Sequence, residues 1–276
     1  MMDYMDECAE MLKKLTGKQF VLFVKRGNTA LRLALKLAKS LGYKIVLLQD
    51  MGGWITYRQF CKKEKLDFSE IKTSHGILEP KILKDYMHCA LLINSMPGYA
   101  ALQKMRELAR IGMKQNIFII NDASGSIGTE EAKFGDVVLG SFAFDKPVNI
   151  SGHGGFIATD DEKYFEFLEK NNIEPLDIDF ISLSEKLNNL NKRLSELKSM
   201  RNKLIKKLEA TGFAKKIVHS DKKDYGDGIN VIVSYDSDAE REKLIKVAEK
   251  EKLEFTLCPR DIRVNEKAVS FEIKRH

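Results

Sequence analysis

A serine and a lysine, Ser141 and Lys146, stand in the segment SFAFDKPVNISGHGGFIATDD, between two apolar runs that have the pattern of buried strands. A lysine in a turn is usually a solvated cation. A lysine held in a pocket at a strand end can instead attack a carbonyl carbon and form a Schiff base with it. Which interpretation applies to Lys146 depends on the other side chains that the chain brings to the same place.

A carboxylate follows another buried strand. Asp122 stands at the end of NIFIIND and opens the Ser/Gly-rich segment INDASGSIG. A carboxylate beside a buried strand is unfavourable unless a cation or a hydrogen-bond donor faces it. The same local pattern is typical of an Asx turn, in which the aspartate caps its own loop. Both roles stay open on local grounds.

Two further strand ends carry groups that can bind a flat anionic ligand. Gly27, Asn28 and Thr29 open a predicted helix after FVLFVK, and backbone N–H groups at a helix start bind phosphate well. Asn and Thr also cap many helices that bind nothing. Trp54 follows a Gly-Gly pair after KIVLL, with Tyr57 close behind it. Either ring would cover a planar ligand or serve as a core aromatic.

All these residues stand where a strand gives way to a loop. Apolar runs alternate with amphipathic segments, which predicts an α/β fold with a mainly parallel sheet and helices on both faces. The ligand of such a fold lies outside the carboxyl ends of its strands. The apolar runs span 20–24, 44–48, 89–94, 116–121, 136–142 and 154–160, and the amphipathic segments span 29–42, 77–87 and 98–112.

The set of groups at this edge matches the needs of pyridoxal 5′-phosphate. A lysine forms a Schiff base with the cofactor aldehyde, and a carboxylate keeps the pyridine nitrogen protonated. An aromatic ring covers the cofactor ring, and a helix start with a serine holds the phosphate. The sequence therefore predicts this cofactor.

The three motifs also resemble those of a known family. In order and spacing they are similar to fold-type I pyridoxal-phosphate enzymes, and within these to the DegT-like branch best known as nucleotide-sugar aminotransferases. RGNTALRLAL resembles the branch's SGTxAL helix start, and INDASGSIG resembles its EDxAxxxG segment. SFAFDKPVNISGHGGFIATDD resembles SFxxxKxxxxGxGGxxxTDD. The resemblance covers roughly residues 1–165 and implies a homodimer that acts on an amino acid and a keto substrate.

The resemblance also implies roles for single residues. Lys146 is the Schiff-base lysine and the acid–base group, and Asp122 holds the pyridine nitrogen. Trp54, with Tyr57 as second choice, stacks on the ring. The remaining expected cofactor contacts are Gly27, Asn28, Thr29 and Ser141 at the phosphate, and Asn94 at the ring hydroxyl.

The chain also departs from that branch. It is shorter, it lacks an evident Asn-x-Arg stretch after the lysine, and Ser124-Gly125 stands where the family often has a glutamine. Substrate contacts are therefore sought elsewhere. Arg260 or Arg263 in CPRDIRV would clamp a substrate carboxylate or form an ordinary ion pair. His153 in GHGG would touch the substrate or fill its turn.

The second half of the chain has a different texture. Leucines at spacings of three and four predict one long helix over 182–209, which packs its apolar stripe on a neighbour or forms a coiled coil. Strand and helix patterns follow it. We therefore predict two domains, a large cofactor-binding α/β domain over 1–175, and a linking helix with a small α+β domain over 176–276.

Composition excludes several classes of protein. The net charge of +6 is modest, and lysines and glutamates are interspersed, which argues against a nucleic-acid interface. No apolar run is long enough to cross a membrane, and no leader peptide is evident. The four cysteines and five histidines show no metal-ligand spacing. We expect a cytoplasmic protein without a bound metal.

Three hypotheses about function follow. The first is an aminotransferase. The second keeps the cofactor but changes the reaction to that of a lyase, desulfurase, racemase or decarboxylase. The third is a relative that binds the cofactor without catalysis and acts as a regulator.

Overall fold

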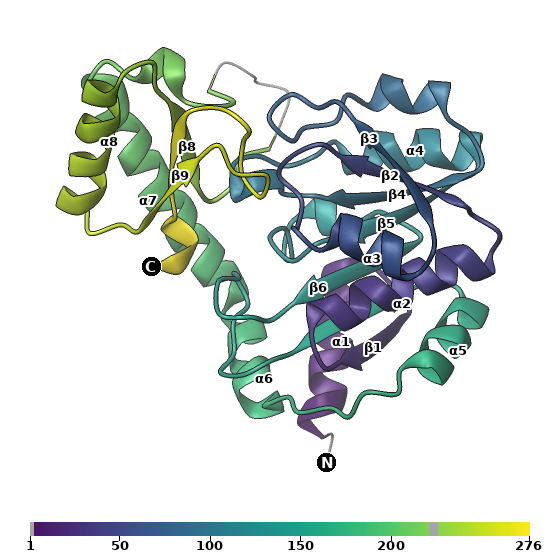
Figure 1. Ribbon diagram of the computed structural model, residues 1–276. Helices are drawn as coiled ribbons and strands as arrows, with labels where there is room; N and C mark the ends of the chain where they lie inside the picture. The colour runs from purple at the N-terminus through teal and green to yellow at the C-terminus, as the bar shows by residue number, and fades with distance from the viewer. Residues whose placement is uncertain (1–2, 221–225) are drawn as a thin grey trace.

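The computed structural model describes residues 3–220 and 226–276 (Figure 1). Its larger part is built on a seven-stranded sheet with the order β1-β7-β6-β5-β4-β2-β3. Neighbouring strands in it are parallel except around β7, which is antiparallel to both β1 and β6. The predicted mainly parallel sheet is therefore confirmed. The strands are β1 (Phe20–Val24), β2 (Ile45–Gln49), β3 (Asp67–Ile71), β4 (Cys89–Asn94), β5 (Ile117–Asp122), β6 (Val137–Ser141) and β7 (Gly155–Thr159).

Helices cover both faces of this sheet, which explains why its central strands are apolar throughout. In β4, Ala90 and Leu92 belong to one apolar layer, whereas Leu91 and Ile93 belong to the opposite one. The first layer contains α2 (Gly27–Ser40), α3 (Tyr57–Lys63) and α5 (Glu162–Asn171). The opposite face is covered by α1 (Tyr4–Thr16), α4 (Met105–Gln115), α6 (Phe180–Asn188) and α7 (Leu190–Ala210).

Three local predictions were wrong. Strand β3 was missed because its sequence, DFSEI, is polar, as suits an edge strand that faces water. The segment predicted to be helical over 77–87 holds only a 3-10 helix, η1 (Pro80–Asp85). The single helix predicted over 182–209 is two helices, because α6 ends and α7 begins around Asn189.

The C-terminal part contains a three-stranded antiparallel sheet with the order β8-β10-β9, and helix α8 (Asp238–Lys250) packs beside it. Figure 1 shows this part, in green and yellow, at one end of the large sheet. Its strands are β8 (Val231–Ser234), β9 (Phe255–Cys258) and β10 (Ala268–Phe271), and the 3-10 helix η5 (Ile273–Arg275) follows.

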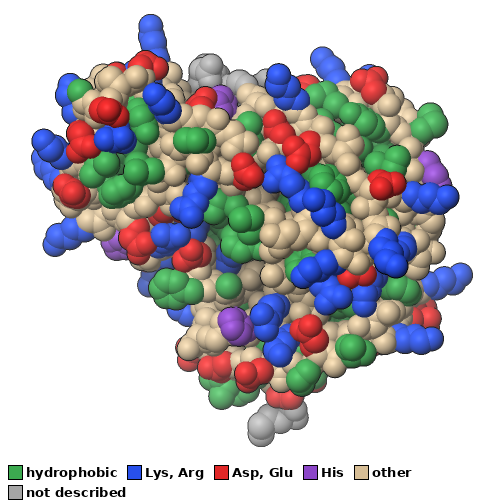
Figure 2. Space-filling view, in the orientation of Figure 1, with side chains coloured by type: hydrophobic (Ala, Val, Ile, Leu, Met, Phe, Trp, Pro, Cys, Tyr) green, Lys and Arg blue, Asp and Glu red, His purple; other side chains and the backbone are tan. Residues whose placement is uncertain are grey.

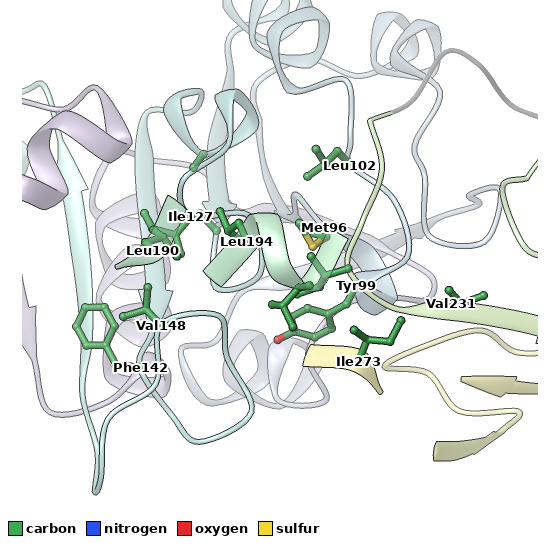
Figure 3. Close-up of a cluster of buried hydrophobic side chains, with 14 of the residues drawn as sticks. Met96, Tyr99, Leu102, Ile127, Phe142, Val148, Leu190, Leu194, Val231 and Ile273 are labelled. Carbon is green, nitrogen blue, oxygen red and sulfur yellow. The ribbon is translucent and has the colours of Figure 1, made fainter. Parts of the chain in front are cut away.

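One hydrophobic cluster runs through both parts of the chain. It extends from α1 through the leucines of α6 and α7 into the small sheet. Figure 3 shows Met96 and Tyr99 of the large part beside Leu194 of α7, with Val231 and Ile273 of the C-terminal part nearby. The two sheets are separate but this core is shared, so the predicted boundary near residue 175 stays a prediction.

The cysteines, possible metal ligands and long helices of the described residues show no further kind of site. The four cysteines are free and buried. Desolvation raises the pKa of Cys61 to about 12 and that of Cys89 to about 11. Across 3–220 and 226–276 no cluster of His, Cys, Asp and Glu has the makeup of a metal site. None of the helices in these ranges is long and apolar enough to span a bilayer.

Candidate active site

A cavity of about 610 Å³ lies at the carboxyl ends of β1, β2, β4, β5 and β6. Parallel strands end at the same edge of a sheet, so residues that are distant in sequence meet there. A volume of this size suits a cofactor together with a small substrate. Every predicted site residue except Thr29 lines the cavity, namely Gly27, Asn28, Trp54, Tyr57, Asn94, Asp122, Ser141, Lys146, His153, Arg260 and Arg263.

The positive end of α2 forms one wall. The amide of Thr29 donates to Arg26 O, so the amides of Gly27 and Asn28 precede the first bond within the helix. Gly27 is tightly enclosed, because a Cβ added to it would lie 2.7 Å from Ser141 Cβ. Glycine therefore keeps the space between the helix start and Ser141 open, which is what an anion seat needs.

The two polar side chains that follow Gly27 differ in direction. Asn28 lines the cavity, and its Oδ1 accepts a hydrogen bond of 3.1 Å from Thr56 Oγ1. Thr29 is buried outside the cavity lining, and its hydroxyl donates to Glu174 Oε2 at 2.8 Å. Asn28, rather than Thr29, therefore lines the cavity at the start of α2.

The carboxylate at the end of β5 is buried and faces donors. Asp122 accepts hydrogen bonds from Tyr57 Oη at 2.6 Å and from its own loop at Ser124 N, 3.0 Å away. Burial, together with the charge of Asp122 and the bond to it, raises the pKa of Tyr57 well above its ordinary value. Tyr57 therefore remains a phenol that orients the carboxylate. Its hydroxyl points at Asp122, and its side chain also lines the cavity.

Lys146 extends from the loop after β6 into the cavity. Its Nζ donates a 2.6 Å hydrogen bond to Tyr99 Oη and lies 5.1 Å from the centre of the Trp54 ring. Burial by itself lowers the pKa of Lys146, but Tyr99 and Asp122 outweigh it, and the net pKa lies above the ordinary value. Lys146 is thus a cation that is hydrogen-bonded inside the cavity, unlike the solvated lysine of an ordinary turn.

Trp54 stands at the mouth of the cavity, with 42% of its surface exposed. Asn94 lies deeper, and its Oδ1 accepts a bond of 2.8 Å from Met96 N. The side-chain Nδ2 of Asn94 remains as the group that can donate a hydrogen bond to a ligand. His153 is exposed at the rim. Lys and Arg side chains are spread across this face of the molecule (Figure 2).

The two arginines of CPRDIRV have different surroundings. Arg263 is buried and donates from Nε and Nη2 to the two carboxylate oxygens of Glu272, at 2.9 and 2.8 Å. This bidentate pair occupies the side of the guanidinium formed by Nε and Nη2. Arg260 is exposed at the rim of the cavity. Both arginines line the cavity, but only Arg263 is held by a buried ion pair.

Sequence reasoning missed several residues of the site. Tyr99 contacts Lys146, and Ser124 Oγ accepts from Ser141 N at 3.0 Å. Lys274, near the end of the chain, also lines the cavity. Tyr99 had a usable signal, because SMPGY follows the strand 89–94 as the other site loops follow theirs. Lys274 stands in no motif that sequence analysis singled out, and it enters the cavity from the C-terminal part.

Two family models match parts of the sequence. The sequence model of the DegT/DnrJ/EryC1/StrS aminotransferase family matches residues 2–200. The chain belongs to this family. Residues 187–276 match the model of the MJ1341 family C-terminal domain, and no curated protein matches the sequence. Family membership confirms the predicted cofactor, pyridoxal 5′-phosphate, and the predicted class of pyridoxal-phosphate-dependent transferase.

Solved structures share the fold at low identity. A DegT DnrJ EryC1 StrS aminotransferase from Brucella abortus has a TM-score of 0.76 at 14% identity, over 99% of this chain and 85% of that one. NtdA from Bacillus subtilis, with bound PMP, has a TM-score of 0.70 at 13% identity, over 99% and 73%. GDP-4-keto-6-deoxy-D-mannose-3-dehydratase from E. coli, with bound hydrated PLP, has 0.74 at 14% identity, over 98% and 87%. The predicted fold type is confirmed.

The cavity of this family member fits its cofactor. The gap that Gly27 keeps open beside Ser141 lies at a helix N-terminus, where a phosphate is favoured. A buried carboxylate, Asp122, lies in the same cavity as a held lysine, Lys146. These groups match the phosphate, the pyridine nitrogen and the aldehyde of the cofactor.

Proposed function

We propose that the chain is a pyridoxal-phosphate-dependent aminotransferase in which Lys146 binds the cofactor aldehyde covalently. The observation that supports this most is the meeting of three groups in one cavity: the amine of Lys146, the carboxylate of Asp122, and the N-terminus of α2. They come from different strand ends. The amine can react with the aldehyde, the carboxylate can pair with the pyridine nitrogen, and the helix start can bind the phosphate.

The proposed roles follow from the geometry. When bound, the cofactor withdraws electrons from the substrate carbon. Asp122, oriented by Tyr57, keeps a proton at the ring nitrogen. Gly27, Asn28 and Ser141 hold the phosphate, and Trp54 covers the ring face at the cavity mouth. All the residues given these roles line the cavity.

Lys146 has a second role in the proposal. Its amine removes and returns the proton at the substrate carbon, because it lies inside the cavity beside Trp54 and Tyr99. A general base must first be uncharged, and the raised pKa of Lys146 opposes this in the ligand-free protein. Binding of the cofactor therefore has to favour the uncharged form of the Lys146 amine.

The substrates proposed are an amino acid and a keto acid or keto sugar. Arg260 is the proposed carboxylate contact, and His153, which also lines the cavity, is a second candidate for substrate contact. Neither identifies a particular substrate. The family model supports the reaction class, whereas the NtdA and Brucella structures, at 13% and 14% identity, support the fold and leave the substrate open.

We also propose a cytoplasmic homodimer. Apolar side chains are exposed around the cavity mouth, with Trp54 at 42%, Ile55 at 56% and Phe144 at 74%. Large exposed apolar groups around a site indicate a covered surface. The four free cysteines suit a reducing compartment. Sedimentation analysis across a concentration series tests the dimer.

The first experiment is an absorption spectrum of the protein with added pyridoxal phosphate, recorded before and after a panel of amino acids. Lys146→Ala is compared with Lys163→Ala, which removes an exposed lysine outside the cavity. We expect a visible band that is lost only in Lys146→Ala and bleached by one amino acid, with release of its keto acid. A band of equal strength in Lys146→Ala would show that another group binds the cofactor.

Elimination chemistry is the second candidate, because a dehydratase shares this fold with a TM-score of 0.74. It predicts a product that has lost water or another leaving group, without net transfer of nitrogen. A desulfurase is disfavoured, because all four thiols are buried and none lines the cavity. A regulatory cofactor binder would keep its visible band with every amino acid tested.

A further inference from the structure

Tyr99 makes the shortest polar contact of Lys146. Its phenol oxygen accepts the 2.6 Å hydrogen bond from Lys146 Nζ, and the lysine amine also lies 5.2 Å from the centre of the Tyr99 ring. The two residues are 47 positions apart in sequence. Tyr99 comes from the loop after β4, whereas Lys146 comes from the loop after β6.

The backbone of Tyr99 is fixed by both parts of the chain. Its φ of +62° lies in the left-handed region, which a bulky residue rarely adopts. Its amide donates to Met96 O at 3.0 Å, and its carbonyl accepts from Ile229 N and Asn230 N, both at 2.8 Å. A Cβ on Gly228 would lie 2.3 Å from that carbonyl oxygen, so glycine permits this approach.

The ring of Tyr99 lies among cations from the C-terminal part. Lys274 Nζ is 4.7 Å and Arg263 Cζ is 5.3 Å from the ring centre. Cations at the face of an aromatic ring are attracted to it, and both of these side chains are buried. Figure 3 shows Tyr99 next to Met96 and close to Ile273, which precedes Lys274. The phenol therefore has little freedom to turn away from Lys146.

We propose that Tyr99 is the positioning residue of the reactive lysine: its phenol oxygen, fixed by the C-terminal part, holds the amine of Lys146 in the cavity. The inference rests on the proposed function, since it matters for catalysis only if Lys146 is the reactive lysine. It adds a role for a loop that none of the recognised motifs includes.

Several other charged groups face this pair. Asp122 at the end of β5 attracts the Lys146 ammonium, whereas Arg263 repels it. Lys274 also repels it, and its own amine donates to Asp145 O at 3.0 Å. These charged groups act on Lys146 through their charge, whereas Tyr99 contacts its amine directly by a hydrogen bond. Removing the phenol oxygen should therefore make Lys146 less basic while the other charges stay in place.

The test measures the reactivity of Lys146 in protein without cofactor. An amine-selective acylating reagent is applied over a pH series, and the modified Lys146 peptide is quantified by mass spectrometry. Tyr99→Phe keeps the ring and removes only the oxygen. Tyr43→Phe is the matched control, because Tyr43 Oη bonds Asn116 at an exposed site outside the cavity. Circular dichroism checks that both variants fold.

A hydrogen bond to a charged group changes an equilibrium by about tenfold. We therefore expect the midpoint of the Lys146 labelling profile to fall by about one pH unit in Tyr99→Phe. Tyr43→Phe should leave it unchanged. An unmoved midpoint in folded Tyr99→Phe would overturn the inference. So would a faster plateau rate with the same midpoint, because that indicates only a looser cavity.

This experiment is independent of the test of function. It uses no cofactor, so an unmoved midpoint would leave the spectral test of Lys146→Ala intact. Conversely, a missing visible band would refute the proposed function while the contact between Tyr99 and Lys146 could still be measured. The two failures are therefore distinguishable.

Discussion

Tyr57 donates a 2.6 Å hydrogen bond to Asp122, and both side chains are almost fully buried. The phenol comes from the start of α3 and the carboxylate from the end of β5. A carboxylate that loses a hydrogen-bond donor inside the protein is destabilised, because the favourable interaction with its charge is lost. This contact therefore links stability to the proposed cofactor site.

Tyr57→Phe should destabilise the protein by about 1–3 kcal/mol, because Asp122 loses one of its hydrogen-bond donors. Urea unfolding measures the difference. Tyr43→Phe, at an exposed hydrogen bond, should change stability by less than about 0.5 kcal/mol. Equal effects of the two substitutions would mean that the contact with Asp122 carries no special weight.

Gly27→Ala should weaken cofactor binding by about tenfold or more, because the new Cβ would lie 2.7 Å from Ser141 Cβ and narrow the phosphate seat. Absorbance titration with pyridoxal phosphate measures the affinity. The double variant Gly27→Ala/Ser141→Gly removes the clashing atom. The clash in Gly27→Ala should also lower its stability in urea, and the double variant should recover that stability. It should not recover affinity for the cofactor, because Ser141 is itself a proposed phosphate contact. Full recovery of affinity would count against that contact.

Because Arg263 pairs with Glu272, the free energy of unfolding should depend on pH in the acidic range. Burial alone raises the pKa of Glu272, but Arg263 and Lys274 lower it more, to about 2. A carboxylate with a depressed folded pKa stabilises the fold above its unfolded value of 4.5, and this contribution is lost as the pH falls toward 2. We expect a loss of about 3 kcal/mol over that window.

Glu272→Gln tests this prediction, because the amide cannot titrate. The variant should be less stable at neutral pH, and it should lack the part of the acid dependence that Glu272 supplies. Glu166→Gln, at an exposed glutamate on α5, is the control and should keep the dependence of the original protein. Parallel pH profiles for all three proteins would show that Arg263 does not stabilise the charged form of Glu272.

Lys274 should act in the opposite pH range. Burial lowers its pKa from 10.5 to about 8, although Glu272 and Asp145 favour its charged form. Between these two values the unfolded chain binds more protons than the folded one, so this residue's contribution to stability rises with pH. Relative to Lys274→Met, the original protein should gain about 2–3 kcal/mol between about pH 7 and about pH 10. Lys170→Met, on an exposed helix face, should give a flat difference.

Much of the site could be predicted because its motifs are local and each follows a strand. Gly27 follows β1, Asp122 ends β5, and Ser141 and Lys146 come from the end of β6 and the loop after it. Parallel strands bring such ends together. The spacing of Ser141 and Lys146 identified the segment. The same rule placed Trp54 at the cavity, because it follows the end of β2.

The sequence alone thus determined the sheet, its ligand-binding edge and the residue types that suit the cofactor, because strand periodicity and loop position are local properties. Only the tertiary structure decided which partners these residues have. Tyr57 points its phenol at Asp122, Arg263 is paired with Glu272, and Tyr99 holds Lys146. Such pairings depend on packing between elements far apart in the chain, and no short motif encodes the side-chain directions that packing selects.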